Sequence, residues 1–356
     1  MIDTKKTTHS RSLPEYMSYG LGIGYSTADT VFGEGVTSCI VECTTHVTTV
    51  SGIQKKRCAE DIQTYLSYLA DHAVYQTFWE EHLVSVPNIQ MITIDKEGVC
   101  DLGITSQNSS EGVVFVRVKQ GCAVQIHERL CSRDMLRLIV HIEIEQDASV
   151  EYVSVPEKES QGVLFVHRTF VTHKASSVTV VDGVPQKKLG KTSILSYLVG
   201  AQASSGVYGV TYGKGNAVSD VFHQTTHLRE STSSHMHTES VLDQHAHTIY
   251  RSLIDIQDNA VQAKGHQTQH TTLLSGSAKI QSIPNLTVSQ KDVECTHGVS
   301  MSQPDEGAAF YLSSRGISEE NARQQLIVAR CNTILSYISD PTIREEILSY
   351  VESLTI

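Results

Sequence analysis

Residues 138–150 read Leu-Ile-Val-His-Ile-Glu-Ile-Glu-Gln-Asp-Ala-Ser-Val and contain both patterns that predict the fold. The apolar residues Leu138, Val140, Ile142 and Ile144 alternate with a second set that is mostly polar. Because successive side chains of a strand point to opposite faces, this alternation predicts a half-buried β-strand. The short polar segment that follows, with its alanine, predicts a turn into another strand.

The same kind of turn recurs along the chain. A polar residue or glycine followed by alanine begins a new strand in six places: Gly-Cys-Ala-Val (121–124), Asp-Ala-Ser-Val (147–150), Lys-Ala-Ser-Ser-Val (174–178), Gly-Asn-Ala-Val (215–218), Asp-Asn-Ala-Val (258–261) and Gly-Ser-Ala-Lys (276–279). The first three alanines are 25 and 27 residues apart. Such a repeat is typical of a β-solenoid, whose coils stack their apolar sides on one another. A β-sandwich needs no shared turn chemistry, so we favour a parallel β-helix.

Other segments extend this assignment to a mainly β core over residues 93–303. Further short strands are predicted at 113–118, 149–155, 163–171, 177–181 and 249–256. The N-terminal region, 1–92, is predicted to have mixed structure, because residues 56–84 have a helical period.

The C-terminal segment, 304–356, is predicted to form two helices. Ser318 is a favourable N-cap with two acidic residues after it, and Pro341 follows Asp340 at the start of a second apolar stripe. The plainest role for such a helical domain is to cap the end of the solenoid.

Composition limits the class of protein. The 356 residues include 28 Lys and Arg against 39 Asp and Glu, a net charge of −11, and 40% are hydrophobic. This balance is that of a globular chain, and the negative charge argues against a general nucleic-acid binder. The sequence contains no run of 18 apolar residues, so no membrane span is predicted. No secretory signal is visible either, and we therefore expect a cytoplasmic protein.

Histidine is concentrated near the end of the predicted core. Nine of the 17 histidines lie between His223 and His297. Two pairs are spaced to point to the same side of a strand: His235 with His237, and His245 with His247. The spacing of His223, His247 and His270 also suggests a stacked ladder. These residues indicate either a metal site or a polar strand surface.

Cys295 and His297 form a sharper candidate. They also alternate by two, so both side chains are expected on one face of a strand. A thiolate beside an imidazole suits zinc or an iron–sulfur cluster. The alternative is a buried cysteine beside a hydrogen-bonded histidine.

Several segments in the last third of the chain, in order and with matching spacing, resemble the SufB/SufD family of iron–sulfur cluster assembly scaffolds. They are Val-Leu-Asp (241–243), Tyr-Arg-Ser-Leu-Ile (250–254), Thr-Leu-Leu-Ser (272–275), Pro-Asn-Leu (284–286), Asp-Val-Glu-Cys-Thr-His-Gly (292–298), Asp-Glu (305–306) and Phe-Tyr-Leu-Ser-Ser-Arg-Gly-Ile-Ser (310–318). The resemblance implies a right-handed parallel β-helix between helical N- and C-terminal parts. It also implies a non-enzymatic scaffold in a complex with a second scaffold and the ABC-type ATPase SufC.

The resemblance further implies roles for individual residues. His297, with Cys295 beside it and His270 nearby, is expected at the interface between two scaffolds, where iron is bound and a cluster assembles transiently. No cluster is expected to bind tightly to this chain alone. The expected contacts to the ATPase are Phe310, Tyr311, Arg315, Gly316 and Ile317.

Two positions favour the SufD branch of the family over the SufB branch. His270 stands where SufB has a cysteine, and Gly298 stands where SufB has a carboxylate. The alternatives are a SufB-like or homodimeric scaffold and, from another class, a carbohydrate-active or histidine–metal β-helix enzyme.

Overall fold

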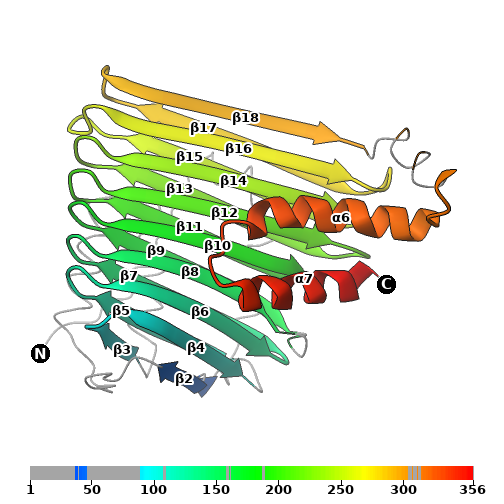
Figure 1. The fold of residues 1–356 in the computed structure, drawn as a ribbon, viewed down its shortest axis with the longest axis horizontal. Helices are drawn as coiled ribbons and strands as arrows, with labels where there is room; N and C mark the ends of the chain where they lie inside the picture. The colour runs from blue at the N-terminus through cyan, green and yellow to red at the C-terminus, as the bar shows by residue number, and fades with distance from the viewer. Residues whose placement is uncertain are drawn as a thin grey trace, which may run out of the picture. The chain divides into compact units, whose positions relative to one another are not determined.

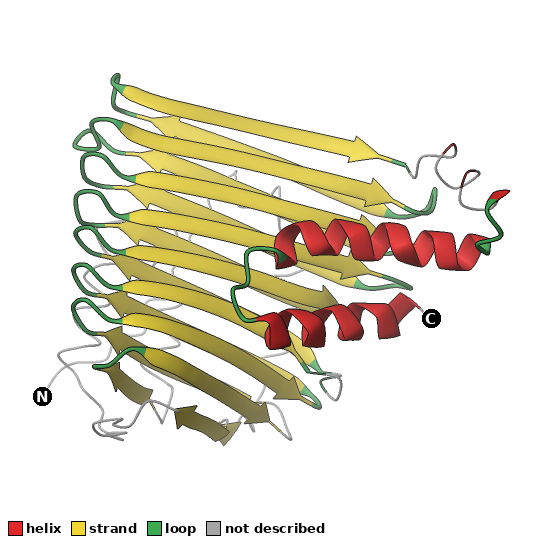
Figure 2. Cartoon of the chain, viewed as in Figure 1, coloured by secondary structure: helices red, strands yellow, loops and turns green. Residues whose placement is uncertain are grey.

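The structure, a computed structural model, describes residues 37–38, 40–45, 89–106, 110–157, 160, 162–186, 189–303, 307, 311 and 314–355. These residues form a parallel β-helix with two helices against one flank (Figures 1 and 2). Each coil gives one strand to each of two sheets, so sequence neighbours lie in different sheets. The predicted β-helix is therefore confirmed, whereas the helical pattern at 56–84 lies outside the described residues.

In the described chain each sheet contains nine strands. The odd-numbered strands form one sheet: β1 Thr37–Ser38, β3 Ile89–Ile94, β5 Ser110–Val118, β7 Met135–Ile144, β9 Val163–Thr172, β11 Leu189–Leu198, β13 Val218–His227, β15 His247–Ile256 and β17 Lys279–Val288. The even-numbered strands form the other: β2 Ile40–Thr45, β4 Gly98–Ser106, β6 Ala123–Ser132, β8 Ser149–Pro156, β10 Ser177–Gln186, β12 Ser204–Gly213, β14 Ser233–Leu242, β16 Ala263–Leu273 and β18 Val293–Ser302. All five predicted strand segments lie within these strands.

The strands pair in parallel, in register from coil to coil, except that β2 is antiparallel to β4. Stacked side chains such as Lys119 and Glu145 are 26 residues apart, whereas His270 and Ser300 are 30 apart. The coils therefore lengthen toward the C-terminal end. Strands β1 and β2 and the first part of β3 lie within 1–92, the predicted N-terminal region, and join the two sheets.

The space between the two sheets, which we call the lumen, contains the main core. Leu138, Val140 and Ile142 of β7 point into it and are fully buried, as their alternation predicts. The opposite face of β7 is buried as well, contrary to the half-buried strand expected. There the rings of His141 and of Phe115 on the neighbouring β5 lie 5.3 Å apart, so large side chains of adjacent coils cover one another.

The recurring turns place a small side chain at the corner of the core. Ala148 follows a residue in the left-handed backbone region and is 1% exposed. At two turns the buried position is one residue from the predicted alanine. Cys122 is buried there, whereas Ala123 is exposed, and Ser176 is buried after Ala175 at φ 54°. The repeat thus reflects the small space at this corner of the core, into which the side chains of alanine, serine and cysteine all fit.

The C-terminal segment forms α6 Glu319–Leu335 and α7 Pro341–Thr355. Both predicted starts are confirmed. The Asn321 N–H donates to Ser318 Oγ at 3.3 Å, and the Thr342 N–H donates to Asp340 Oδ1 at 2.8 Å. Neither helix of the described chain is long and apolar enough to cross a membrane.

These helices do not cap the end of the solenoid. They lie across the outer face of the even sheet, from β8 to β14 (Figure 1). Ile327 and Ile334 of α6 and Ile347 of α7 belong to a cluster with apolar side chains of those strands, and Arg129 of β6 donates to both Glu346 oxygens at 2.6 and 2.7 Å. The two helices were predicted correctly, but the surface that their apolar residues cover lies several coils back along the chain.

A charged cluster interrupts the apolar lumen. Arg168 of β9 and Glu128 of β6 are both fully buried, and Arg168 Nε donates to Glu128 Oε2 at 3.0 Å. The Tyr152 hydroxyl donates to Glu128 Oε1 at 2.5 Å, and Arg168 Nη1 lies 3.5 Å from Asp182 Oδ1. Burial alone would lower the pKa of Arg168, but the two carboxylates raise it above its ordinary value. The guanidinium is therefore charged and ties the two sheets together.

Buried histidines predict a loss of stability in acid. Burial lowers the pKa to about 4 for His141 and His227 and to about 3 for His167 and His223, from an ordinary value of 6.5. The unfolded chain takes up these protons near pH 6.5 and the folded chain does not. The free energy of unfolding therefore suffers no loss from these histidines above pH 6.5. Between pH 6.5 and pH 4 it falls by about 1.4 kcal/mol per pH unit for each histidine.

Urea unfolding at pH 7 and pH 5 measures this loss. The midpoint is expected to fall at pH 5, and to fall less in His223→Gln, which removes one buried titrating group. The partly exposed His266 is the control, and His266→Gln should leave the difference unchanged. Equal wild-type midpoints at the two pH values would contradict the prediction.

Candidate functional site at the open end of the β-helix

The last coil, made by β17 and β18, is exposed to solvent. Among the described strands, none pairs with the outer edge of either. Val288, Val299 and Met301 are 42%, 37% and 57% exposed, although equivalent residues of earlier coils are buried. Terminal repeats of solenoids are usually capped, and free strand edges are usually covered. We call β17 and β18 the open end, and its exposed apolar side chains are typical of an interaction surface.

Cys295 and His297 lie on the lumen side of β18. Cys295 is opposite Gly265 and packs against the main apolar core. His297 is opposite Gln267, which is 1% exposed and hydrogen-bonded to Ser252 of the odd sheet. Since alternate residues of a strand share a face, both predicted ligands point toward the end of the lumen. The expectation that they share one face agrees with this register.

The environments of Cys295 and His297 differ. Burial raises the pKa of the Cys295 thiol, with a smaller contribution in the same direction from Glu294, so the thiol is protonated at neutral pH. His297 is exposed. In the part of the chain that the structure describes, the two belong to no group of three or more metal ligands. Within the described residues, the two side chains therefore offer two donor atoms and no third.

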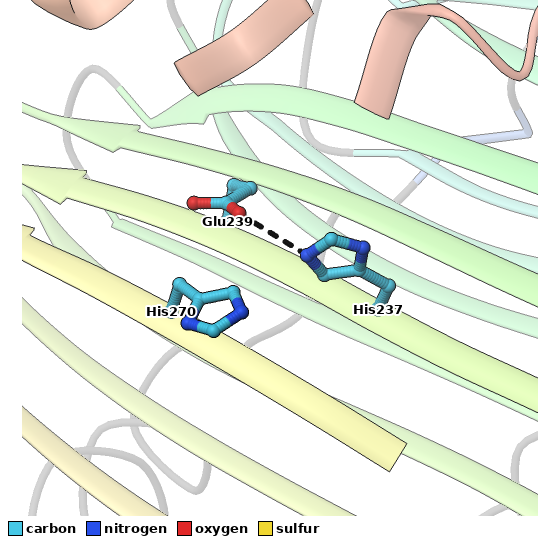
Figure 3. A group of neighbouring side chains, drawn as sticks. All are labelled: His237, Glu239 and His270. Atoms are coloured by element: carbon cyan, nitrogen blue, oxygen red, sulfur yellow. Dashed lines mark hydrogen bonds and ion pairs between the residues drawn. The ribbon is translucent and has the colours of Figure 1, made fainter. Parts of the chain in front are cut away.

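The structure does not bring His270 together with these two residues. Its neighbours Gln269 and Thr271 point into the lumen and are buried, so His270 lies on the outer face of β16. There its side chain is close to His237 and Glu239 of β14 (Figure 3).

The predicted histidine ladder is wrong. His223 of β13 is opposite Ser252, and His247 of β15 is opposite Val218. His270 belongs to the other sheet. The ladder failed because the coils at this level are longer than the spacing of the histidines.

The segment expected to contact the ATPase precedes α6. Tyr311 is 55% exposed, and the Arg315 guanidinium carbon lies 5.2 Å from the centre of its ring. Gly316 has φ +85°, a conformation that side chains rarely adopt, and Ile317 is half-buried. Phe310 lies outside the described residues. The described part is therefore an exposed aromatic–cationic surface beside a tight turn.

Comparison with known families identifies this architecture. The model of the SUF system FeS cluster assembly, SufBD core domain, matches residues 103–330. The chain belongs to the SufBD family. The match includes β5 to β18, and therefore the open end with Cys295 and His297, the two predicted ligands.

Relatives of this SufBD protein are distant. The iron–sulfur cluster assembly protein SufD of Escherichia coli is 24% identical over 136 residues, which are 38% of this chain and 32% of the relative. A SufBD family protein of Staphylococcus epidermidis is 25% identical over 214 residues, 60% of this chain and 45% of the relative. SufD of Plasmodium berghei is 24% identical over 237 residues, 65% of this chain and 18% of the relative. The chain thus spans less than half the length of each.

One group of this SufBD chain was missed from the sequence. His235 and His237 were expected to share a face, and their ring centres lie 6.4 Å apart. Glu239 continues the same alternation and was overlooked. A His-x-His-x-Glu run on a predicted strand is a local signal for three aligned metal ligands, and the contribution of His270 depends on the register of β16.

Proposed function

We propose that this chain is a SufD-like scaffold subunit that pairs with a SufB-like scaffold during iron–sulfur cluster assembly. The observation that carries the proposal is the open end, where Cys295 and His297 lie on the lumen side of the last strand beside exposed apolar side chains. The iron–sulfur cluster is the cargo of this complex and is held transiently. This chain contributes ligands and a surface, without a catalytic step.

The partner scaffold supplies what the open end lacks. Its strands cover the edges of β17 and β18 and bury Val299 and Met301. His297 offers an exposed imidazole to iron, and the Cys295 thiol loses its proton when a metal approaches. The remaining ligands come from the partner.

A SufC-like ATPase is proposed to dock on the segment that leads into α6. The stacked pair of Tyr311 and Arg315 offers an aromatic face and a positive charge, and Gly316 and Ile317 shape the turn beside it. Phe310, outside the described residues, is proposed as a further contact to the ATPase. A cytoplasmic site of action agrees with the unpaired thiols of Cys122, Cys295 and Cys331.

Co-purification of the full chain with its cognate SufB and SufC proteins tests this function. Native mass is expected to give one copy of this chain, one SufB and two ATPases. A stable homodimer that binds neither protein would overturn the proposal and favour the homodimeric scaffold, whose open ends face each other. We prefer a pair with a SufB-like scaffold to a homodimer because His270 and Gly298 favour the SufD branch of the family.

His297→Ala is expected to reduce cluster assembly without unfolding the chain. The side chain is exposed, so its removal leaves no cavity, but the site loses an iron ligand. We expect iron and sulfide in the reconstituted complex to fall by about tenfold or more. The control is His266→Ala, on the outer face of the adjacent strand. Wild-type loading in His297→Ala would exclude a ligand role.

A further inference from the structure

The outer face of the even sheet holds a second group of ligands. His237 and Glu239 of β14 are two residues apart and point to the same side, and Glu239 is directly opposite His270 of β16. His237 Nε2 and Glu239 Oε1 are 3.1 Å apart. One ligand atom from each of the three side chains lies within 4.8 Å of the others, and Figure 3 shows the three converging.

A hydrogen bond orients one of these side chains, and burial removes another from water. His270 Nδ1 and Ser300 Oγ are 2.5 Å apart, which leaves Nε2 as the ring nitrogen available to an ion. A hydrogen bond on the opposite nitrogen is how proteins commonly orient a histidine ligand. Glu239 is 3% exposed, beside α6. A carboxylate so removed from water requires a positive partner.

The protein supplies that partner only weakly. Arg330 of α6 places Nη1 at 3.9 Å from Glu239 Oε2, beyond a good hydrogen bond, and 47% of the arginine side chain is exposed. The other oxygen, Oε1, faces His237. The carboxylate of Glu239 can therefore bind a cation more closely than it binds Arg330.

We propose that His237, Glu239 and His270 bind a divalent transition-metal ion between β14, β16 and α6. Two imidazoles and a carboxylate form a donor set of zinc sites that keep an open fourth position, and also the set that holds non-haem Fe²⁺. Ligands about 2.1 Å from a metal are at most about 4.2 Å apart. The three ligand atoms, which lie within 4.8 Å of one another, therefore need to approach only slightly when an ion binds.

This site is separate from the proposed assembly interface. Cys295 and His297 lie on the lumen side of the even sheet, whereas these ligands lie on its outer face. Metal binding here needs neither SufB nor SufC, so it can fail while the scaffold function holds, and the reverse is also true.

Zn²⁺ titration of the full chain, prepared without a histidine tag, tests the proposal against a competing chromogenic chelator. The wild-type protein is expected to bind a first Zn²⁺ more tightly than it binds any further Zn²⁺. His270→Gln and Glu239→Gln should each weaken that site by more than about tenfold, since even indirect supporting groups are worth 10–100-fold. Thermal unfolding without metal shows whether each variant folds, and the half-buried His270 is the safer position.

His266→Gln is the matched control. His266 lies on the same strand and face as His270 and has the same kind of hydrogen bond, from Nδ1 to Thr296 Oγ1 at 2.9 Å. It is opposite His235 rather than a carboxylate. We expect its affinity for Zn²⁺ to equal that of wild type. Equal losses in His266→Gln and His270→Gln, or no tight site in wild type, would overturn the proposal.

A third variant should change affinity in the opposite direction. Arg330→Ala removes the competing cation from Glu239 Oε2, so we expect tighter Zn²⁺ binding. Unchanged or weaker binding would contradict the role of Glu239. Anaerobic Fe²⁺ competition then tests for selectivity: displacement of Zn²⁺ at equal concentrations would identify an iron-selective site, because the ordinary order of affinities favours Zn²⁺ over Fe²⁺.

Discussion

Replacing Glu128 by glutamine is expected to lower the free energy of unfolding by about 3–5 kcal/mol, because it leaves the fully buried Arg168 without its main counter-charge. Glutamine has nearly the same volume, so cavity formation adds little. Asp182 stays near Arg168, but its closest oxygen is 3.5 Å away, and its own burial disfavours the charged form by raising its pKa. Urea unfolding at pH 7 measures the change.

Two controls isolate the electrostatic effect. The double variant Glu128→Leu with Arg168→Met removes both charges of the pair and is expected to recover part of the lost stability, since apolar replacements of buried ion pairs are often neutral and the raised pKa of Asp182 favours its uncharged form once Arg168 is gone. The pair of Lys119 and Glu145 is partly exposed, so Glu145→Gln should cost less than about 1 kcal/mol. A loss in Glu128→Gln no greater than in Glu145→Gln would show that the buried pair does not hold the sheets together.

The β-helix was predictable because its determinants are local. Alternation in β7 gives a strand, and a small residue after each turn gives the repeat. The buried pair of Glu128 and Arg168 was not predictable in this way. The two residues come from different sheets and meet only after the coil closes, so neither local pattern signals the other.

The tail and the sites show the same limit. The apolar stripes of α6 and α7 were visible, but a stripe does not specify the surface that it covers. Strand parity placed Cys295 and His297 together, and the same parity separates His270 from them. The pairing of His270 with Glu239 depends on the length of the coil between β14 and β16, and the spacing of the turns in the sequence does not specify that length. A register shift of one residue would move every side chain of the strand to the opposite face.

Met301→Glu is expected to abolish pairing with the SufB-like scaffold while leaving the free chain folded. Met301 is 57% exposed, so a carboxylate there stays in water when the chain is alone. If the partner covers the open end as proposed, pairing moves that charge into an apolar interface. An unpaired buried charge costs about 3 kcal/mol or more, which is over about 100-fold in the dissociation constant.

The control for this charge is Ala123→Glu, which adds the same carboxylate at an exposed position at the start of β6, far from the open end. Its affinity for the partner should match that of wild type, and both variants should unfold thermally as the wild type does. Wild-type affinity in Met301→Glu would mean that the scaffolds do not meet at this end. Cys295 and His297 would then lack the outside ligands that cluster assembly requires, and the outer-face group of His237, Glu239 and His270 would remain as the metal site of the chain.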